Sequence, residues 1–428
     1  YFLKRPAEAR RITSHDYTES HQRGQLLLVA VLWFGAPPAE GILIKDTNMS
    51  ELNTANEKTT TGFVELSDKG YGFLRHHENN YQTTGEDVFL TKEIIHHYGL
   101  QPGLEVTATL AKAKGKKRTG PRVKEVLSIN GRDVEEWKKI INFTDHVAID
   151  PCPRIQLETP GGPMEMRMLD LVTPIGYGQR GLIVAPPRSG KTVLLQQIAH
   201  GVSVNAPEAK LFILLVDERP EEVTDFRMNC PYAEVVASCN DNDIHVHTRV
   251  AVMTIERARR MAEFGEDVII LLDSITRLGR AFNRTVKDSG RTMSGGVDIR
   301  ALEIPKRLFG SARKLENSGS VTIIATALVE TGSRMDDLIF EEFKGTGNME
   351  LQLDRRMAEM RVWPAVDIPR SGTRKEELLM DEFSLSKIHK LRRMLSDLPV
   401  QEEVPTMLKA IGRFETNADF LANFNPER

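Results

Sequence analysis

The fold is decided by Ala185-Pro-Pro-Arg-Ser-Gly-Lys-Thr192, which joins an apolar run (residues 181–185) to an expected helix (residues 193–200). The spacing is that of a phosphate-binding loop, GxxxxGK[ST], with Ala185 at the first position instead of glycine. Backbone N–H groups of such a loop and of the following helix start converge on an anion. A strand that passes through this loop into a helix predicts an α/β domain that binds nucleotide phosphates. The alternative is a chance match on an ordinary strand-to-helix turn.

Each residue type in the loop suits that chemistry. Gly190 lets the backbone approach a phosphate closely, Lys191 places a positive charge on the outer phosphates, and Thr192 offers its hydroxyl to Mg²⁺. The residues expected to contact the nucleotide are Arg188, Ser189, Gly190, Lys191, Thr192 and Val193.

Two acidic residues follow other apolar runs. Asp273 comes directly after residues 268–272, and Glu218 lies two positions beyond residues 211–216. A carboxylate at the carboxyl end of a buried strand is well placed to hold Mg²⁺, which predicts a metal role for Asp273. Glu218 can polarise an attacking water, as a general base must. The alternative is a pair of helix-capping or solvated acids.

From residue 171 onwards, apolar runs alternate with helical stretches. The runs cover residues 181–185, 211–216, 268–272 and 321–325. Such runs are typical of strands covered on both faces, so an α/β domain with a mainly parallel sheet is expected over residues 171–428. The chain from residue 387 is expected to be helical, and the Pro- and Gly-rich residues 129–170 to be a connector.

Residues 61–128 show a different sequence pattern, which predicts five short strands and one small helix. A hairpin is expected over residues 61–75, and Thr91 can cap a helix that Gly99 ends. Five short strands with one helix predict a small closed β-barrel of the OB or cold-shock type.

Aromatic and basic residues on this barrel indicate an RNA-binding surface. Tyr71 and Phe73 alternate on one strand, Phe89 lies on the next, and Arg75 can hold a base edge or a phosphate. Bases stack on such rings, at ~1–3 kcal/mol each. The alternative for two aromatic residues at this spacing is an ordinary barrel core. Residues 111–124 carry seven basic residues and no acid, which predicts phosphate contacts that include Lys117 and Arg118, or else a solvated hairpin.

Composition limits the other possibilities. The 57 basic and 60 acidic residues give a formal net charge of −3, which excludes a polybasic coat over the whole chain. Three cysteines without metal-type spacing predict free thiols in a reducing compartment, the cytoplasm. The longest apolar run, residues 26–34, is too short to span a membrane, although it vaguely resembles a signal peptide. Residues 1–60 are expected to be a disordered or foreign extension, with a possible natural start at Met49.

Five long strings resemble the transcription termination factor Rho family, whose members are hexameric RNA-dependent ATPases. The resemblance covers about residues 60–420 and implies a RecA-like ATPase domain with ATP and Mg²⁺. The strings are Pro174-Ile-Gly-Tyr-Gly-Gln-Arg-Gly-Leu-Ile-Val-Ala-Pro-Pro187, Asp217-Glu-Arg-Pro-Glu-Glu-Val223, Leu272-Asp-Ser-Ile-Thr-Arg-Leu278, Glu341-Glu-Phe-Lys-Gly-Thr-Gly-Asn-Met-Glu350 and Arg370-Ser-Gly-Thr-Arg-Lys375.

The resemblance also implies roles that spacing alone does not give. Arg374 matches an arginine finger that acts on the ATP of a neighbouring subunit, and Arg361 matches a second arginine near that interface. Trp363 resembles the aromatic residue beside the nucleotide base, and Arg219 is expected near the same nucleotide. Without the resemblance, Arg374 would be an ordinary surface arginine and Trp363 a core residue.

A second RNA site is implied within the ring of subunits. By resemblance, two pore loops grip RNA, with flexible surface cations as the alternative. The first loop carries Arg284, Lys287 and Arg291, and the second carries Arg334. Lys344, in a separate segment at residues 343–347, is also expected to contact RNA.

The sequence thus predicts a homohexameric, ATP-driven RNA translocase and helicase that ends transcription. Its expected partners are the nascent single-stranded transcript and the RNA polymerase elongation complex, and no membrane. Two rivals remain: a subunit of a rotary ATP synthase, and a passive RNA-binding protein with an inactive nucleotide site.

Overall fold

The computed structural model describes residues 58–111, 120–285, 295–298 and 300–425. The expected extension up to residue 57, including Met49, lies outside the described residues. Lys117, Arg118, Lys287 and Arg291 also lie outside them.

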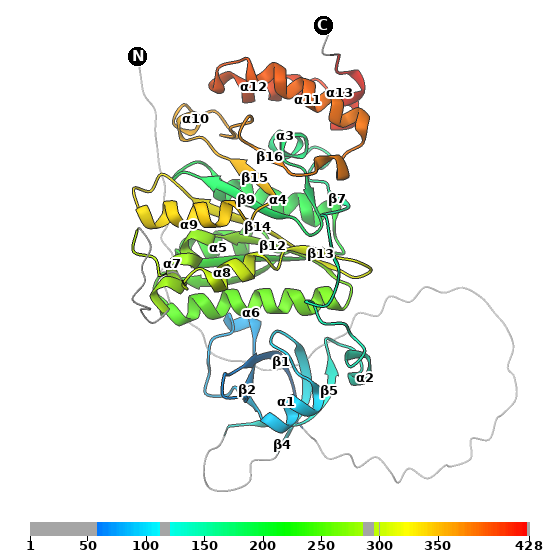
Figure 1. The fold of residues 1–428 in the computed structure, drawn as a ribbon, viewed down its shortest axis with the longest axis vertical. Coiled ribbons are helices and arrows are strands. Elements are labelled where there is room, and N and C mark those ends of the chain that lie inside the picture. Colours follow the sequence, from blue (N-terminus) through cyan, green and yellow to red (C-terminus); the bar gives the residue numbers. More distant parts are fainter. Residues whose placement is uncertain (1–57, 112–119, 286–294, 299, 426–428) are drawn as a thin grey trace, which may run out of the picture. The chain divides into compact units, whose positions relative to one another are not determined.

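The amino-terminal domain is the expected closed five-stranded barrel (Figure 1). Helix α1 (Lys92–Tyr98) begins where the Thr91 hydroxyl accepts a hydrogen bond from the Ile94 N–H, and it ends at Gly99, where φ is +60°. In barrel order the strands are β1 (Thr59–Leu66), β2 (Gly72–Arg75), β3 (Val88–Leu90), β5 (Arg122–Ile129) and β4 (Glu105–Ala111).

Side chains alternate along the barrel strands between an inner face, which forms the core, and an outer face. Val64, Leu74 and Leu90 are fully buried inside it. Phe73 pairs with Phe89 across β2 and β3, and both alternate with these core residues, so their rings lie on the outer face.

The second domain contains the expected mainly parallel sheet. Its six central strands are parallel to their neighbours, while β16 (Gly372–Thr373) adds an antiparallel edge. In sheet order the parallel strands are β11 (Glu234–Cys239), β10 (Lys210–Glu218), β12 (Asp267–Asp273), β14 (Ser320–Leu328), β9 (Arg180–Ala185) and β15 (Met349–Gln352).

Helices cover both faces of this sheet (Figure 1). Ile213 and Leu215 of β10 enter one core, while Leu214 and Val216 enter the other. The first core is shared with α3 (Met164–Val172), α4 (Lys191–Asn205), α5 (Pro220–Asn229), α11 (Glu382–Ser396), α12 (Val400–Ile411) and α13 (Asn417–Asn423). The second is shared with α6 (Ile244–Glu263), α7 (Ile275–Thr285), α8 (Glu303–Phe309) and α9 (Arg334–Lys344).

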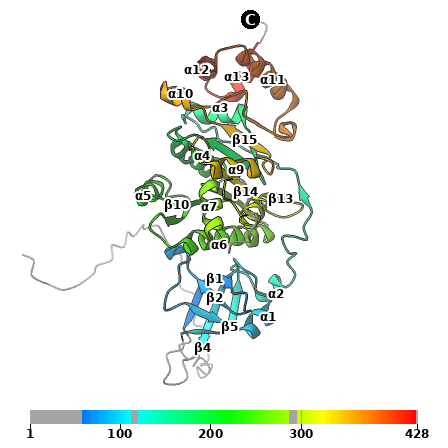
Figure 2. The same cartoon turned by 60° about the vertical axis from the view of Figure 1, so that its left-hand side comes forward.

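The carboxyl-terminal chain is helical, as expected, and its three helices pack beside α3 (Figure 2). Among the described residues, no helix has both the length and the apolar character needed to cross a membrane. The three cysteines, all within the described chain, carry free thiols.

The segment expected to be a connector belongs partly to the second domain. Helix α3 is buried in the first core. Strand β6 (Ala148–Ile149) pairs with β13 (Arg313–Leu315), which itself pairs with β14. The remaining short elements are α2 (Val134–Trp137), β7 (Arg154–Ile155), β8 (Ile175–Gly176) and α10 (Arg355–Glu359).

Helix α6 carries several of the contacts that join the barrel to the sheet domain. Arg249 Nε donates to Glu65 at 2.8 Å, and Arg257 donates to the Tyr81 hydroxyl at 3.2 Å. Tyr81 is fully buried, and this burial raises its pKa to about 12.

Candidate nucleotide-binding and RNA-binding sites

The loop after β9 has the geometry of a phosphate cradle. Gly190 adopts φ +84°, and a side chain there would come within 2.8 Å of the Trp363 ring. The Ser189 hydroxyl is buried and donates to the Pro186 carbonyl at 2.8 Å, so it closes the loop. Arg188 is exposed, and its backbone adopts a positive φ of +66°. Val193, in the first turn of α4, is 58% exposed.

The lysine and the two predicted acids meet at the carboxyl edge of the sheet. Lys191 Nζ donates to Asp273 and lies 3.8 Å from Glu218 Oε1. The Thr326 hydroxyl donates to the other oxygen of Asp273 at 2.7 Å. Because β9, β10, β12 and β14 are parallel, their carboxyl ends bring these residues together.

Burial shapes the charges of this cluster. Burial, together with the neighbouring charge of Asp273, raises the pKa of Glu218 to about 7, against the opposing charges of Lys191 and Arg277. Burial acts to lower the pKa of Lys191, but the charges of Asp273 and Glu218 outweigh it, so the pKa is raised. Lys191 therefore stays charged.

The donor set fits a phosphate ligand with Mg²⁺. Glu218 is fully buried, and neither of its oxygens accepts a hydrogen bond within the described part of the chain. Such orphaned acceptors call for a partner that the protein itself does not supply. Thr192 lies half-buried in the first turn of α4, and Asp273 offers a second carboxylate, which are the oxygen ligands Mg²⁺ prefers.

Sequence reasoning missed two residues of this cluster. Arg277 Nε lies 3.2 Å from Glu218 Oε1, and Arg277 also donates to the Asp217 carbonyl. Thr326 holds Asp273 from the neighbouring strand β14. Arg277 lies in the first turn of α7, just past Asp273 at the end of β12, and this position at the same edge of the sheet was a signal in the sequence. Thr326 carried no comparable signal.

Trp363 lies at the surface beside the loop and not in the core. It is 40% exposed and lines a cavity of about 170 Å³ with Gly190 and Val193. Arg361, two residues earlier, is exposed, and its backbone adopts a positive φ of +61°. Arg219 is exposed at the start of α5, next to Glu218.

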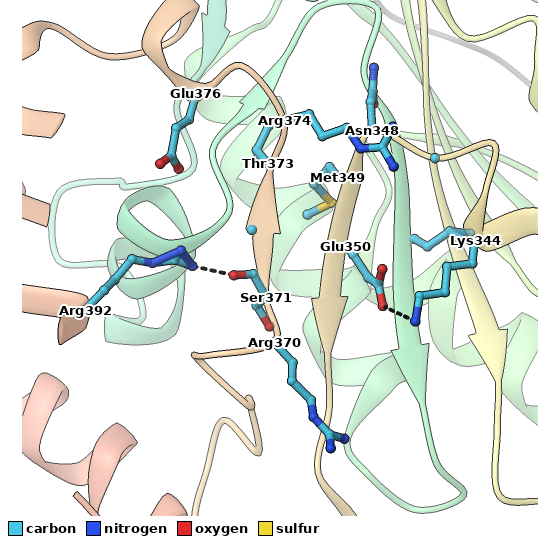
Figure 3. A pocket seen from close by; sticks show the side chains of 13 residues that line it. Lys344, Asn348, Met349, Glu350, Arg370, Ser371, Thr373, Arg374, Glu376 and Arg392 are labelled. Carbon is cyan, nitrogen blue, oxygen red and sulfur yellow. Dashed lines mark hydrogen bonds and ion pairs between the residues drawn. The ribbon is translucent and has the colours of Figure 1, made fainter. Parts of the chain in front are cut away.

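Arg374 lies in a different cavity, of about 350 Å³ (Figure 3). Its N–H donates to the Asn348 carbonyl, and the Asn348 N–H donates to the Arg180 carbonyl, both at 2.9 Å. Arg374 therefore sits level with the amino end of β9, whereas the phosphate loop follows Ala185 at the other end. The five steps along the strand from Arg180 to Ala185 span roughly 16 Å. An arginine side chain is too short to bridge that separation to the loop of its own chain.

The barrel presents three aromatic rings in one surface cluster. Tyr71, Phe73 and Phe89 are half-buried, with ring centroids 5.5 to 5.8 Å apart. The barrel core is filled by other residues, which disfavours the core alternative for these rings. Arg75 is buried, forms ion pairs with Glu65 and Asp87, and lies 4.8 Å over the Phe73 ring.

Comparison with known proteins identifies both domains. Residues 60–135 match the Rho termination factor RNA-binding domain, and residues 165–373 match the ATP synthase alpha/beta family nucleotide-binding domain. Transcription termination factor Rho of Cereibacter sphaeroides is 47% identical, with 85% of this chain and 86% of the relative covered. The Rho protein of Aquifex aeolicus is 46% identical, with 90% of this chain and 88% of the relative covered. That of Bacillus subtilis is also 46% identical, with 86% of this chain and 84% of the relative covered.

The chain belongs to the transcription termination factor Rho family. Its ATPase domain also shares its fold with an ATPase of a bacterial type III secretion system. That likeness has a TM-score of 0.51 at 23% identity, and it covers 66% of this chain and 77% of the other.

The ring-lining residues expected from the Rho family are only partly described. Arg284 lies in the last turn of α7 and Arg334 begins α9, and both are exposed. Gly295 lies against the backbone of Arg334. Lys344 lies at the opposite end of α9, 4.0 Å from Glu350, in the same cavity as Arg374 (Figure 3).

Proposed function

We propose that this Rho-family chain is an RNA-dependent ATPase that moves along the nascent transcript and terminates transcription. One observation carries the proposal. An aromatic RNA-binding barrel and a complete set of phosphate-handling residues, Lys191, Thr192, Glu218 and Asp273, occur in one chain. The second half of the chain alone would also fit a rotary ATP synthase subunit, because it matches that family's nucleotide-binding domain. The match of the first half to an RNA-binding domain argues against that alternative.

The cluster supplies the parts that ATP hydrolysis needs. Lys191 is charged and positioned for the outer phosphates, and Thr192 and Asp273 would hold Mg²⁺. When bound, Mg²⁺ neutralises charge that develops on the phosphate oxygens. Oε2 of Glu218 has no partner in the described chain and the pKa of Glu218 is about 7, which suits a carboxylate that orients water and takes its proton. Arg277 keeps that carboxylate in place.

Arg374 supports an assembly in which each active site is shared. A guanidinium supplied by a neighbouring subunit can accelerate phosphoryl transfer by ~10³–10⁵. Because Arg374 lies at the sheet edge opposite its own phosphate loop, it is placed to serve another subunit's nucleotide. We infer a homohexamer of the Rho type, in which hydrolysis at the interfaces drives RNA past Arg284 and Arg334. Its further partner would be the RNA polymerase elongation complex in the cytoplasm.

The decisive experiment measures ATP hydrolysis with and without single-stranded RNA. The proposal predicts a low rate alone and a strong increase with RNA, and no hydrolysis in a Lys191→Ala control. Hydrolysis that is indifferent to RNA would favour the rotary-type alternative. Strong RNA binding without any hydrolysis would favour the passive RNA-binding protein.

A further inference from the structure

Strand β10 contains a one-residue bulge directly before Glu218. Against the neighbouring strand β11, Val216 pairs with Ser238 and Glu218 pairs with Cys239, so Asp217 has no counterpart. Asp217 adopts φ +57°, a left-handed conformation that is uncommon for residues other than glycine. Bulges of this kind redirect a side chain and are frequent beside active sites, so the position of this one bears on the catalytic carboxylate.

The bulge decides which face of the sheet receives that carboxylate. Val216 enters the core shared with α6 and α7, and side chains alternate between the two faces along a strand. In a regular strand, Glu218 would lie two positions after Val216 and would face the same side. With the extra residue, Glu218 takes the next position and lies on the face of α4, 3.8 Å from Lys191. Its pairing partner Cys239 packs against the core shared with α4 as well.

Two side chains hold the backbone of the bulge. Ser238 is fully buried, and its Oγ accepts a hydrogen bond from the Asp217 N–H at 3.3 Å and donates one to the Leu215 carbonyl at 3.5 Å. Arg277 donates to the Asp217 carbonyl and lies 3.2 Å from Glu218 Oε1. A bulged residue is left without its partner in the ladder, and the Ser238 hydroxyl supplies one. Arg277 reaches the catalytic carboxylate itself, whereas these hydrogen bonds of Ser238 act on the backbone before it.

We propose that Ser238 is a positioning residue for ATP hydrolysis, because its hydroxyl fixes the bulge that presents Glu218 to the phosphate site. The inference rests on the proposed ATPase function and adds to it one residue outside the cluster of charged groups. The competing explanation is a purely structural role, since a buried hydroxyl that is hydrogen-bonded can stabilise any sheet. Such a role would change thermal stability and leave the chemical step untouched.

Removal of the hydroxyl separates these explanations. Ser238→Ala deletes it without adding atoms, and Ser238→Thr keeps it. Ser320→Ala is the matched control, because Ser320 is also fully buried in the sheet and donates to Asp267 at 2.6 Å, but at the amino end of β14, away from Glu218. Single-turnover hydrolysis of MgATP with saturating single-stranded RNA measures the chemical step in the intact chain. Equilibrium binding of MgADP reports on the nucleotide site, and thermal melts measure stability.

Ser238→Ala should lower the single-turnover rate about tenfold, the effect of losing one hydrogen bond that aligns a catalytic group, with the affinity for MgADP unchanged. Ser238→Thr should retain most of the wild-type rate, and Ser320→Ala should lower Tm without changing the rate. A wild-type rate in a folded Ser238→Ala chain, or an equal fall in Ser320→Ala, would overturn the inference alone. If the wild-type chain showed no hydrolysis with RNA, the proposed ATPase function would fail and the inference with it.

Discussion

At the scale of single residues, the nucleotide site depends on charges held out of water. Lys191 is ion-paired with Asp273 and lies near Glu218, so its ammonium is already directed to the place where phosphates would enter. Glu218 is buried without a hydrogen bond to either oxygen in the described chain. These two side chains give separate predictions.

Lys191→Ala should abolish hydrolysis and leave RNA binding by the barrel largely intact. The lysine contacts acids of the nucleotide site only, and the aromatic cluster belongs to another domain. Hydrolysis assays and filter binding of RNA, made on the same preparation, measure the two effects. Joint loss of both activities in a folded variant would contradict the division into two sites.

The pKa of Glu218 predicts how hydrolysis depends on pH. Since the carboxylate form accepts the proton of water, kcat/KM for MgATP should rise as pH increases through about 7, the pKa in the free chain. A pH profile of kcat/KM measures this rise. A profile that stays flat between pH 6 and pH 8 would contradict a base with this pKa.

The same pKa predicts that Glu218→Gln stabilises the folded chain at high pH. The pKa is raised by burial from 4.5 to about 7, so the folded state holds its proton more firmly than the unfolded state does. Stability is therefore lost as pH rises between these values, by up to about 3 kcal/mol. Thermal melts should show a higher Tm for Glu218→Gln at pH 8 and little difference at pH 4.5. Equal melting at both pH values would count against a raised pKa.

At the scale of elements, a pair of strands builds the aromatic cluster. Cross-strand pairing of Phe73 with Phe89 places both rings on the outer face of β2 and β3, and Tyr71 joins them from the turn before β2. Arg75 is held by Glu65 and Asp87, so its guanidinium lies over Phe73 in a fixed position. The cluster is therefore a preformed stacking surface.

Replacing Tyr71 and Phe73 together with Ala should weaken RNA capture by a few kcal/mol, because each ring can stack one base. Hydrolysis should still occur when RNA is in excess. Fluorescence anisotropy with labelled single-stranded RNA measures the affinity, and circular dichroism checks the fold of the barrel. Tyr232→Ala, a change at an exposed tyrosine of the ATPase domain, is the control. Normal affinity in a folded double variant would show that the rings do not bind bases.

At the scale of the whole molecule, one chain does not bring Arg374 to its own phosphate loop. Its phosphate loop and Arg374 lie at opposite ends of β9 and open into separate cavities. Either the arginine is not used, or a second copy of the chain completes the site. In the shared-site arrangement proposed above, assembly is a condition for fast hydrolysis.

Arg374→Ala should bind ATP almost normally and hydrolyse it at a small fraction of the normal rate, since its own loop and Mg²⁺ ligands are intact. Equilibrium binding and steady-state kinetics on the same sample separate these effects. Arg370→Ala, a change at an exposed neighbour with no role proposed above, is the control. A dilute, monomeric preparation that hydrolyses ATP fully and loses that activity on Arg374→Ala would contradict action across subunits.

Mixing two inactive variants tests sharing directly. In mixed rings, some interfaces combine the intact phosphate loop of an Arg374→Ala subunit with the intact arginine of a Lys191→Ala subunit. Such an interface contains one complete active site. Hydrolysis above that of either variant alone is expected in mixed rings.

The sequence by itself determined the strands and the acids of the nucleotide site. Buried parallel strands appear in the sequence as apolar runs, and their carboxyl ends meet at one edge of the sheet. Lys191, Glu218 and Asp273 could therefore be placed together from the sequence alone. The barrel was predictable because its short alternating strands are separated by strong turn residues.

Only the tertiary structure decided the rest. The segment 129–170 has no clear periodicity, so the burial of α3 and the pairing of β6 with β13 came from packing against distant elements. The ion pairs of Arg75, the contact of Thr326 with Asp273 and the position of Lys344 beside Arg374 depend on which strands and helices are neighbours. Sequence spacing carries no such information, because contacts between elements are set by the way the whole chain packs.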